Sequence, residues 1–86
     1  MRDTTVEGLD DGFKYSFGSD CSIVCAAMNL AREVGRVEEE SDAITSVCII
    51  DGKTLIAFIR AKAKGHEKII EKINETGRYK LIAWDW

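Results

Sequence analysis

The sequence predicts a small α+β domain built as a two-layer sandwich, with two helices packed on one face of an antiparallel sheet. Residues 43–50 and 53–62 are runs rich in β-branched and apolar side chains on either side of a single Asp-Gly pair, which is typical of a β-hairpin. Residues 13–17 alternate aromatic with polar side chains, as in a half-buried strand. Apolar residues between positions 20 and 36 recur at helical spacing.

The chain begins with residues 1–10, which are polar and lack periodicity, so we expect a flexible arm with at most a short strand near residues 5–7. The first full strand follows this arm. A glycine ends that strand, and Ser19 or Asp20 can accept a hydrogen bond from the first turn of the next helix. The ordered α+β domain is therefore expected to cover residues 11–86.

The first helix is expected from about Asp20 to Arg36. One side of it carries an apolar stripe that is broad enough to lie on a sheet. The stripe consists of Ile23, Ala26, Ala27, Leu30 and Val34. Residues 38–42 then hold four acidic side chains, and we expect a solvated loop there.

A hairpin with its turn at Asp51-Gly52 would organise the rest of the sheet, because a type I′ turn requires positive φ at two residues, which Asp and Gly tolerate. Its second strand, residues 53–62, would turn one apolar face to the helices. Cations are expected on the other face, since burying them unpaired would cost several kcal/mol. The side chains on that other face are Ile56, Phe58, Arg60 and Lys62. A three-residue bulged loop would shift the register by one residue, and this alternative stays open.

A second helix is expected over residues 66–75, where three isoleucines form an apolar seam. Residues 79–86 form the last strand, one side of which points away from the core. The side chains expected on that side are Lys80, Ile82, Trp84 and Trp86. The resulting order, βαββαβ, is that of ferredoxin-like domains with four strands and both helices on one face. A fifth strand, or a different strand order, is the alternative.

Length and composition limit the functions that this chain can have. Its 86 residues support one small hydrophobic core. No apolar run approaches the roughly 20 residues of a membrane span, and the first residues lack the pattern of a secretory signal. We therefore expect a cytoplasmic protein that has no membrane partner. The three cysteines, Cys21, Cys25 and Cys48, are too few and too irregular for a disulfide framework, so we expect free thiols.

Charge is distributed unevenly along the chain. Residues 1–42 hold 4 Lys and Arg against 10 Asp and Glu, a net charge of −6. Residues 43–86 hold 8 against 5, a net charge of +3. The protein is therefore expected to have an acidic and a basic side, which matters more for its partners than the total charge of −3.

Nothing in the sequence indicates an enzyme, a cofactor or a metal site. No nucleophile–base motif, phosphate-binding loop or dinucleotide fingerprint occurs. Cys21 and Cys25 lie four residues apart on the expected helix, and His66 is the single histidine. These three residues are too few for a tetrahedral zinc site, although the reactivity of the two thiols stays open.

Protein–protein contact is the function that the residue types favour. Trp, Phe and Arg are enriched at the centres of interfaces, and the open sheet face would collect them. The residues expected there are Phe58, Arg60, Lys62, Trp84 and Trp86. We therefore expect a small non-catalytic binding protein, either a regulator or inhibitor or an assembly subunit. Its partner would be a larger protein or a ribonucleoprotein, or a second copy that makes a homodimer.

The acidic segment offers a second docking surface. Glu38, Glu39 and Glu40 could meet a basic partner, including one that normally holds nucleic acid. The alternative function is binding of single-stranded RNA on the open sheet face, with aromatic side chains beside a basic rim. That rim would include Arg60, Lys62, Lys64, Lys68 and Lys72. The excess of acids opposes this alternative.

Overall fold

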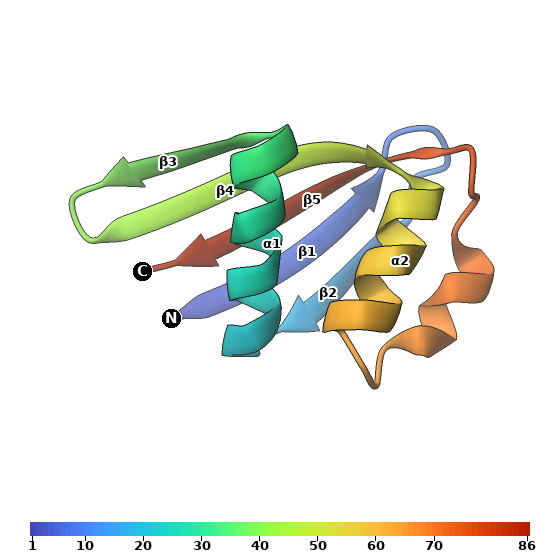
Figure 1. The fold of residues 1–86 in the computed structure, drawn as a ribbon, viewed down its shortest axis with the longest axis horizontal. Helices are drawn as coiled ribbons and strands as arrows, with labels where there is room; N and C mark the ends of the chain where they lie inside the picture. The colour runs from blue at the N-terminus through green and yellow to red at the C-terminus, as the bar shows by residue number, and fades with distance from the viewer.

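Five strands form one antiparallel sheet, and helices cover one face of it in the computed structural model, which describes all 86 residues (Figure 1). The elements are β1 (Arg2–Gly8), β2 (Lys14–Gly18), α1 (Cys21–Val34), β3 (Arg36–Glu40), β4 (Ala43–Asp51), α2 (Gly52–Lys62), the short 3-10 helix η1 (Glu67–Lys72) and β5 (Arg78–Asp85). The strand order is β2-β1-β5-β4-β3. The predicted α+β class is confirmed, with the fifth strand. The ferredoxin-like arrangement is not confirmed, because two strands precede α1 and the last strand lies at the centre of the sheet.

The N-terminal residues, which were expected to be a flexible arm, form β1 between β2 and β5. Thr4 and Val6 are fully buried on the helix side of the sheet, and Asp3, Thr5 and Glu7 lie on the other face. The expectation was wrong because the inward side of this strand shows one apolar residue only. Its other buried position is a threonine, so the sequence shows no alternation of apolar and polar side chains.

β2 and α1 confirm the first predicted strand and helix. The carboxylate of Asp20 accepts a hydrogen bond of 2.9 Å from the backbone N–H of Ser22 and so caps the N-terminus of α1. The helix ends at Val34, earlier than expected, because the chain turns at Gly35 into β3. A side chain at Gly35 would collide with the backbone oxygen of Val47.

The acidic segment was predicted to be a loop, and this was wrong, because most of it belongs to the edge strand β3. β3 pairs with β4 only, and Val37 is its one residue packed against the core. The remaining side chains of β3 are exposed. Charged side chains are typical of edge strands, where they oppose pairing with other chains. An edge strand of this kind therefore has the same polar amino-acid composition as a loop, which is why the sequence predicted a loop here.

The prediction of a second hairpin strand was also wrong, because residues 53–62 belong to the helix α2. Asp51 ends β4, and its carboxylate accepts a hydrogen bond of 2.8 Å from the N–H of Thr54 to cap this helix. The helix buries one side against the sheet. The buried side chains are Leu55, Ile56, Phe58 and Ile59, whose spacing of one, three and four residues is helical.

The last segment forms η1 where a longer helix was expected, and then β5, which confirms the last predicted strand. β5 lies at the centre of the sheet between β1 and β4 (Figure 1). Its inward side chains are buried, and these are Tyr79, Leu81 and Ala83. The two ends of the chain lie side by side, since the N–H of Trp86 donates a hydrogen bond of 2.8 Å to the carbonyl of Met1. No helix is both long and apolar enough to cross a membrane.

Candidate functional site

The face of the sheet that no helix covers carries a group of apolar side chains on its two central neighbouring strands. We call this group the sheet patch, and it consists of Val47 and Ile49 of β4 with Ile82 and Trp84 of β5. Val47 lies directly opposite Ile82 in the ladder. Ile49 is 57% exposed, and the other three side chains are partly exposed. An antiparallel sheet with one solvated face normally carries polar residues on that face, so an apolar group there indicates a contact surface.

Two tryptophans mark one end of the sheet patch. Trp84 and Trp86 pack edge to face with their ring centroids 6.4 Å apart, and Trp86 is 53% exposed. Beside Trp84 lies a shallow hollow of about 380 Å³, lined also by Thr5 and Lys14 of the adjoining strands. A partly exposed tryptophan next to a hollow offers both an anchor and a place for a partner's side chain.

Acidic residues continue the same face beyond the sheet patch. Trp84 pairs with Thr45 of β4, and Thr45 pairs with Glu38 of β3, so the carboxylate of Glu38 lies in the same row on the same face. Glu40 shares this face two residues further along β3, whereas Glu39 points to the other side. We call the exposed acids of the β3–β4 hairpin the acidic hairpin, and they are Glu38, Glu39, Glu40 and Asp42.

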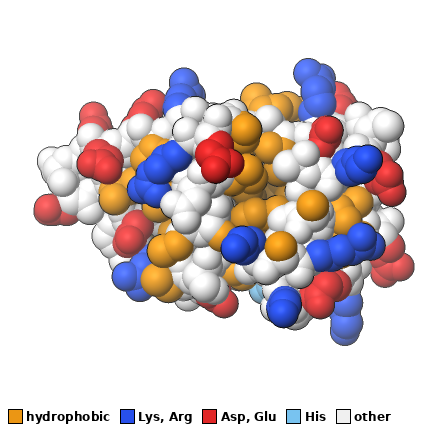
Figure 2. All heavy atoms as spheres, viewed as in Figure 1, with side chains coloured by type: hydrophobic (Ala, Val, Ile, Leu, Met, Phe, Trp, Pro, Cys, Tyr) orange, Lys and Arg blue, Asp and Glu red, His pale blue; other side chains and the backbone are white.

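The acidic hairpin projects beyond α1 at one end of the molecule (Figure 1), and acidic side chains gather at that end in Figure 2. Arg36 lies 3.8 Å from Glu38, but both side chains are exposed, so this ion pair contributes little. On the opposite side of the sheet patch, β1 contributes Asp3 and Glu7 to the open face. Glu7 lies between two cations of this face, Lys80 of β5 and Lys14 of β2, and Arg78 shares the side of β5 that carries Lys80. The border of the sheet patch therefore carries charges of both signs, and acids predominate only toward the acidic hairpin.

Three of the predicted partner-binding residues are not part of this face, which corrects the prediction for Phe58, Arg60 and Lys62. Phe58 is only 7% exposed and lies edge to face against Phe17 in the core, with ring centroids 6.3 Å apart. Arg60 and Lys62 are exposed on α2, on the helix side of the sheet. The error follows from the secondary structure, because a helix sends Phe58 and Arg60 to different sides where a strand would align them.

Trp84 and Trp86 lie where the alternation of the last strand predicted them, and Glu38 and Glu40 join them on the open face. Sequence reasoning missed Val47 and Ile49. The signal was the nearly unbroken apolar run from 43 to 50, which gives β4 apolar side chains on both faces.

The three cysteines are free, with Cys21 and Cys25 exposed and Cys48 buried. The neighbouring thiol of Cys21 raises the pKa of Cys25 above its usual value, and burial raises the pKa of Cys48. Both shifts favour the thiol over the nucleophilic thiolate. His66 is partly buried, and its Nδ1 lies 2.6 Å from the hydroxyl of Tyr15.

The acids with a shifted pKa lie at exposed positions and serve structural contacts. The guanidinium and the backbone N–H of Arg78 both hydrogen-bond to Asp10 and lower the pKa of that carboxyl. Hydrogen bonds from the side chain and the backbone N–H of Ser22 lower the pKa of Asp20, and those from Thr54 lower the pKa of Asp51. No group of three or more His, Cys, Asp and Glu side chains lies together in a way that could hold a metal ion.

No protein-family model matches the chain, and comparisons with curated proteins and with solved structures found no match.

Proposed function

We propose that this chain is a small non-catalytic binding protein that acts by protein–protein interaction, and that a larger protein docks on the sheet patch. The observation that carries this proposal is the position of Trp84. Its ring lies on the uncovered face of the sheet, in line with the apolar side chains of β5 and β4 and beside the exposed ring of Trp86.

The sheet patch has the composition of an interface centre. Interfaces combine an apolar, aromatic core with a polar border that stays in contact with water, and tryptophan is among the residues that most often dominate binding energy. Here three aliphatic side chains accompany Trp84, and charged side chains surround them. The strands hold these side chains rigidly, so little conformational entropy is lost when a partner binds.

The acidic hairpin at one end of the sheet patch defines the chemistry of the partner. Glu38 and Glu40 of the acidic hairpin lie on the open face beyond Trp84, whereas the acids of β1 on this face alternate with the cations Lys14 and Lys80. A partner that presents an apolar contact with a basic patch on the side of the acidic hairpin would complement this arrangement. A regulator or inhibitor of such a protein, or an assembly subunit of a larger complex that contains it, would act in this way. A ribonucleoprotein with a basic protein surface belongs to the same class of partner.

The alternative, single-stranded RNA on the same face, has less support. Stacking on Trp84 and Trp86 would be available, but the acids of β1 and β3 would repel the phosphate backbone. The basic side chains Arg60 and Lys62 lie on α2, on the helix side of the sheet.

A cytoplasmic location is part of this proposal. It is supported by the three cysteines, which are all free, as is usual in a reducing compartment.

Affinity capture tests the proposal with wild type, Trp84→Ala, the double variant Glu38→Lys plus Glu40→Lys, and the matched control Arg60→Ala on the opposite side. The expected result is a captured protein that Trp84→Ala loses and Arg60→Ala keeps. The double variant should slow association at low salt, because rim charges mainly act on the association rate. Circular dichroism confirms that each variant is folded. Equal recovery by folded Trp84→Ala would refute the proposal.

Sedimentation of the pure protein separates the homodimer from a different partner. If the sheet patch binds a second copy, wild type will sediment as a dimer and Trp84→Ala as a monomer. A filter-binding assay with single-stranded RNA at low and high salt tests the alternative. Retention that disappears in Trp84→Ala would favour RNA over a protein partner.

A further inference from the structure

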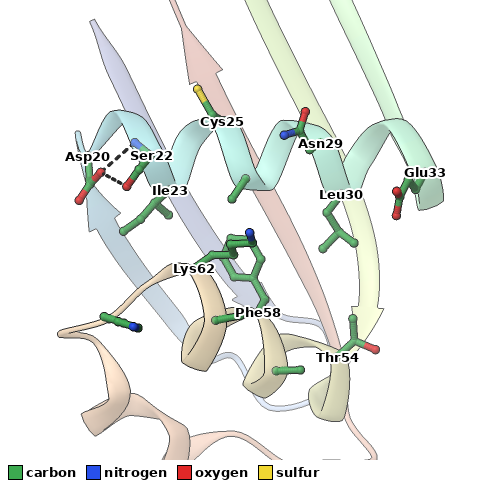
Figure 3. Close-up of a pocket in the computed structure, with 14 residues that line it drawn as sticks. Asp20, Ser22, Ile23, Cys25, Asn29, Leu30, Glu33, Thr54, Phe58 and Lys62 are labelled. Carbon is green, nitrogen blue, oxygen red and sulfur yellow. Dashed lines mark hydrogen bonds between the residues drawn. The ribbon is translucent and has the colours of Figure 1, made fainter.

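A hollow larger than the one beside Trp84 lies on the opposite side of the protein from the sheet patch, between the two α-helices. We call it the helix groove, and it has a volume of about 960 Å³. Figure 3 shows Ile23 and Leu30 of α1 pointing toward α2, and Phe58 of α2 pointing toward α1. Figure 2 shows hydrophobic side chains at the bottom of this hollow. The two helices therefore leave an open, apolar channel between them.

Small side chains keep the helix groove open on the α2 side. Ala57 and Ala61 line it and are exposed, and Thr54 stands one turn before Ala57. On the α1 side, Ala26 and Leu30 line it and are partly exposed. The floor is closed by Phe58, which is buried. A groove with low walls and an apolar floor suits the apolar face of a helix better than a small enclosed ligand.

The charges beside the helix groove are mainly basic on the α2 side, in a protein whose total charge is −3. α2 carries Lys53, Arg60 and Lys62 and no acid between Gly52 and Lys62, and Lys64 follows it. Lys62 and Lys64 line the groove.

Two acids also line the helix groove, both from the α1 side. The carboxylate of Asp20 is already occupied by the backbone N–H and the hydroxyl of Ser22, at 2.9 and 2.6 Å. Glu33 lies in the last turn of α1, whereas Lys62 and Lys64 lie at the C-terminal end of α2. The two helices run in opposite directions (Figure 1), so Glu33 is at the other end of the groove from the lysines.

We propose that the helix groove binds an amphipathic helix of a partner protein, with the apolar face of that helix on Leu30, Ala57 and Phe58. Acidic side chains along one flank of the bound helix would pair with Lys62 and Lys64. α1 has 14 residues, which at about 1.5 Å per residue gives a contact roughly 21 Å long. The occupant is therefore an acidic amphipathic helix of about four turns.

This site is independent of the sheet patch, because the sheet separates the two. One partner on each side can be held at the same time, which would make the chain a small adaptor between a basic surface and an acidic helix. Loss of one site leaves the other intact, so the two proposals fail separately.

A phage-displayed peptide library tests the helix groove on the full chain. Each peptide has about 16 residues in a helix-forming sequence, with leucines fixed on one face and Glu, Lys or Gln varied at the flanking positions. We expect wild type to enrich Glu over Lys at the flank by about fivefold or more. Lys62→Glu should abolish or reverse that preference. Arg60→Glu is the matched control, since it makes the same charge change on the same helix outside the groove.

The strongest enriched peptide is then labelled and its affinity measured by fluorescence anisotropy. Ala57→Gln, which places a longer neutral side chain in the groove, should raise the Kd by about fivefold or more, and Trp84→Ala should not change it. The proposal would be overturned if no peptide is enriched, or if Lys is enriched at the flank. It would also be overturned if Lys62→Glu and Arg60→Glu lose the preference for Glu equally. A dimer of the pure protein that Ala57→Gln dissociates would also overturn it, because a second copy would then fill the groove.

Discussion

The carboxylate of Asp51 accepts a hydrogen bond of 2.8 Å from the backbone N–H of Thr54, and this contact begins α2 where β4 ends. The neighbouring N–H groups are also paired, because Gly52 donates to the carbonyl of Gly77 at 2.9 Å and Lys53 donates to that of Glu75 at 3.1 Å. The first N–H groups of a helix have no partner within the helix. Here a side chain and the loop before β5 supply three of those partners, so this junction connects the sheet, α2 and the last loop.

Asp51→Ala should lower the stability of the protein, because the N–H of Thr54 loses its partner and the start of α2 loses its cap. Asp51→Asn should lower it less, since an asparagine oxygen accepts the same hydrogen bond. Urea unfolding of the three proteins checks the order of the midpoints. If wild type and Asp51→Ala have the same urea midpoint, the cap contributes nothing to the stability of the protein.

The stability of the protein should fall in acid as capping carboxyls become protonated. Capping lowers the pKa of Asp51 and Asp20 below the ordinary 3.8, and Arg78 does the same for Asp10. A carboxyl with a lower pKa in the folded state stabilises that state above the unfolded pKa, and this stabilisation is lost as the pH falls through the folded pKa. Urea midpoints should therefore stay level from neutral pH down to the ordinary range of aspartate and decline below it.

Asp51→Asn provides the control for this pH dependence, because it keeps the cap and removes the titrating group. Its decline in acid should be shallower than that of wild type. An equally steep decline would show that Asp51 has the same pKa in the folded and unfolded states.

Gly52→Ala should destabilise the protein by about 1–3 kcal/mol, because any side chain at this position is forced into the backbone. A Cβ atom at Gly52 would collide with the carbonyl of Asn74, and the backbone on both sides is held by hydrogen bonds. Lys53→Ala, at an exposed position in the same turn, should change stability by less than about 0.5 kcal/mol. Equal urea midpoints for Gly52→Ala and wild type would show that the loop moves away without cost.

The Asp-Gly pair explains why half of the predicted hairpin was wrong. Asp and Gly favour a two-residue turn, but Asp also caps helices and Gly also permits close approach of another segment. The sequence around Asp51 and Gly52 does not distinguish these roles, because the loop that approaches Gly52 is more than 20 residues away at Asn74. The apolar spacing of 55, 56, 58 and 59 favoured a helix, and the β-branched composition of the segment hid it.

The elements that could be predicted are those whose pattern depends on local sequence. The aromatic alternation of β2, the capped amphipathic helix α1 and the alternation of β5 all show their period directly. β1 and β3 could not be predicted, because a buried threonine and an acidic edge break the pattern of a strand. β1 pairs with β5, which is distant in the sequence, and β3 pairs with β4, which follows it in the chain.

The candidate site was predicted in part for the same reason. The alternation of β5 places Trp84 on the open face whatever the strand order is. The prediction for Phe58 depended on the secondary structure of α2 and failed with it. The helix groove could not be predicted at all, since it requires two helices at a particular separation across the sheet.

Thr4→Val should stabilise the protein by about 1 kcal/mol, because it removes a buried hydroxyl that has no hydrogen-bond partner. Thr4 is fully buried in β1, and valine has the same shape and a strong preference for strands. Thr5→Val, on the open face of the same strand, is the control and should change stability by less than about 0.5 kcal/mol. Urea unfolding measures both variants. A lower midpoint for Thr4→Val would mean that the hydroxyl does have a partner in the folded protein, such as a buried water, and that the centre of the sheet is not dry at this position.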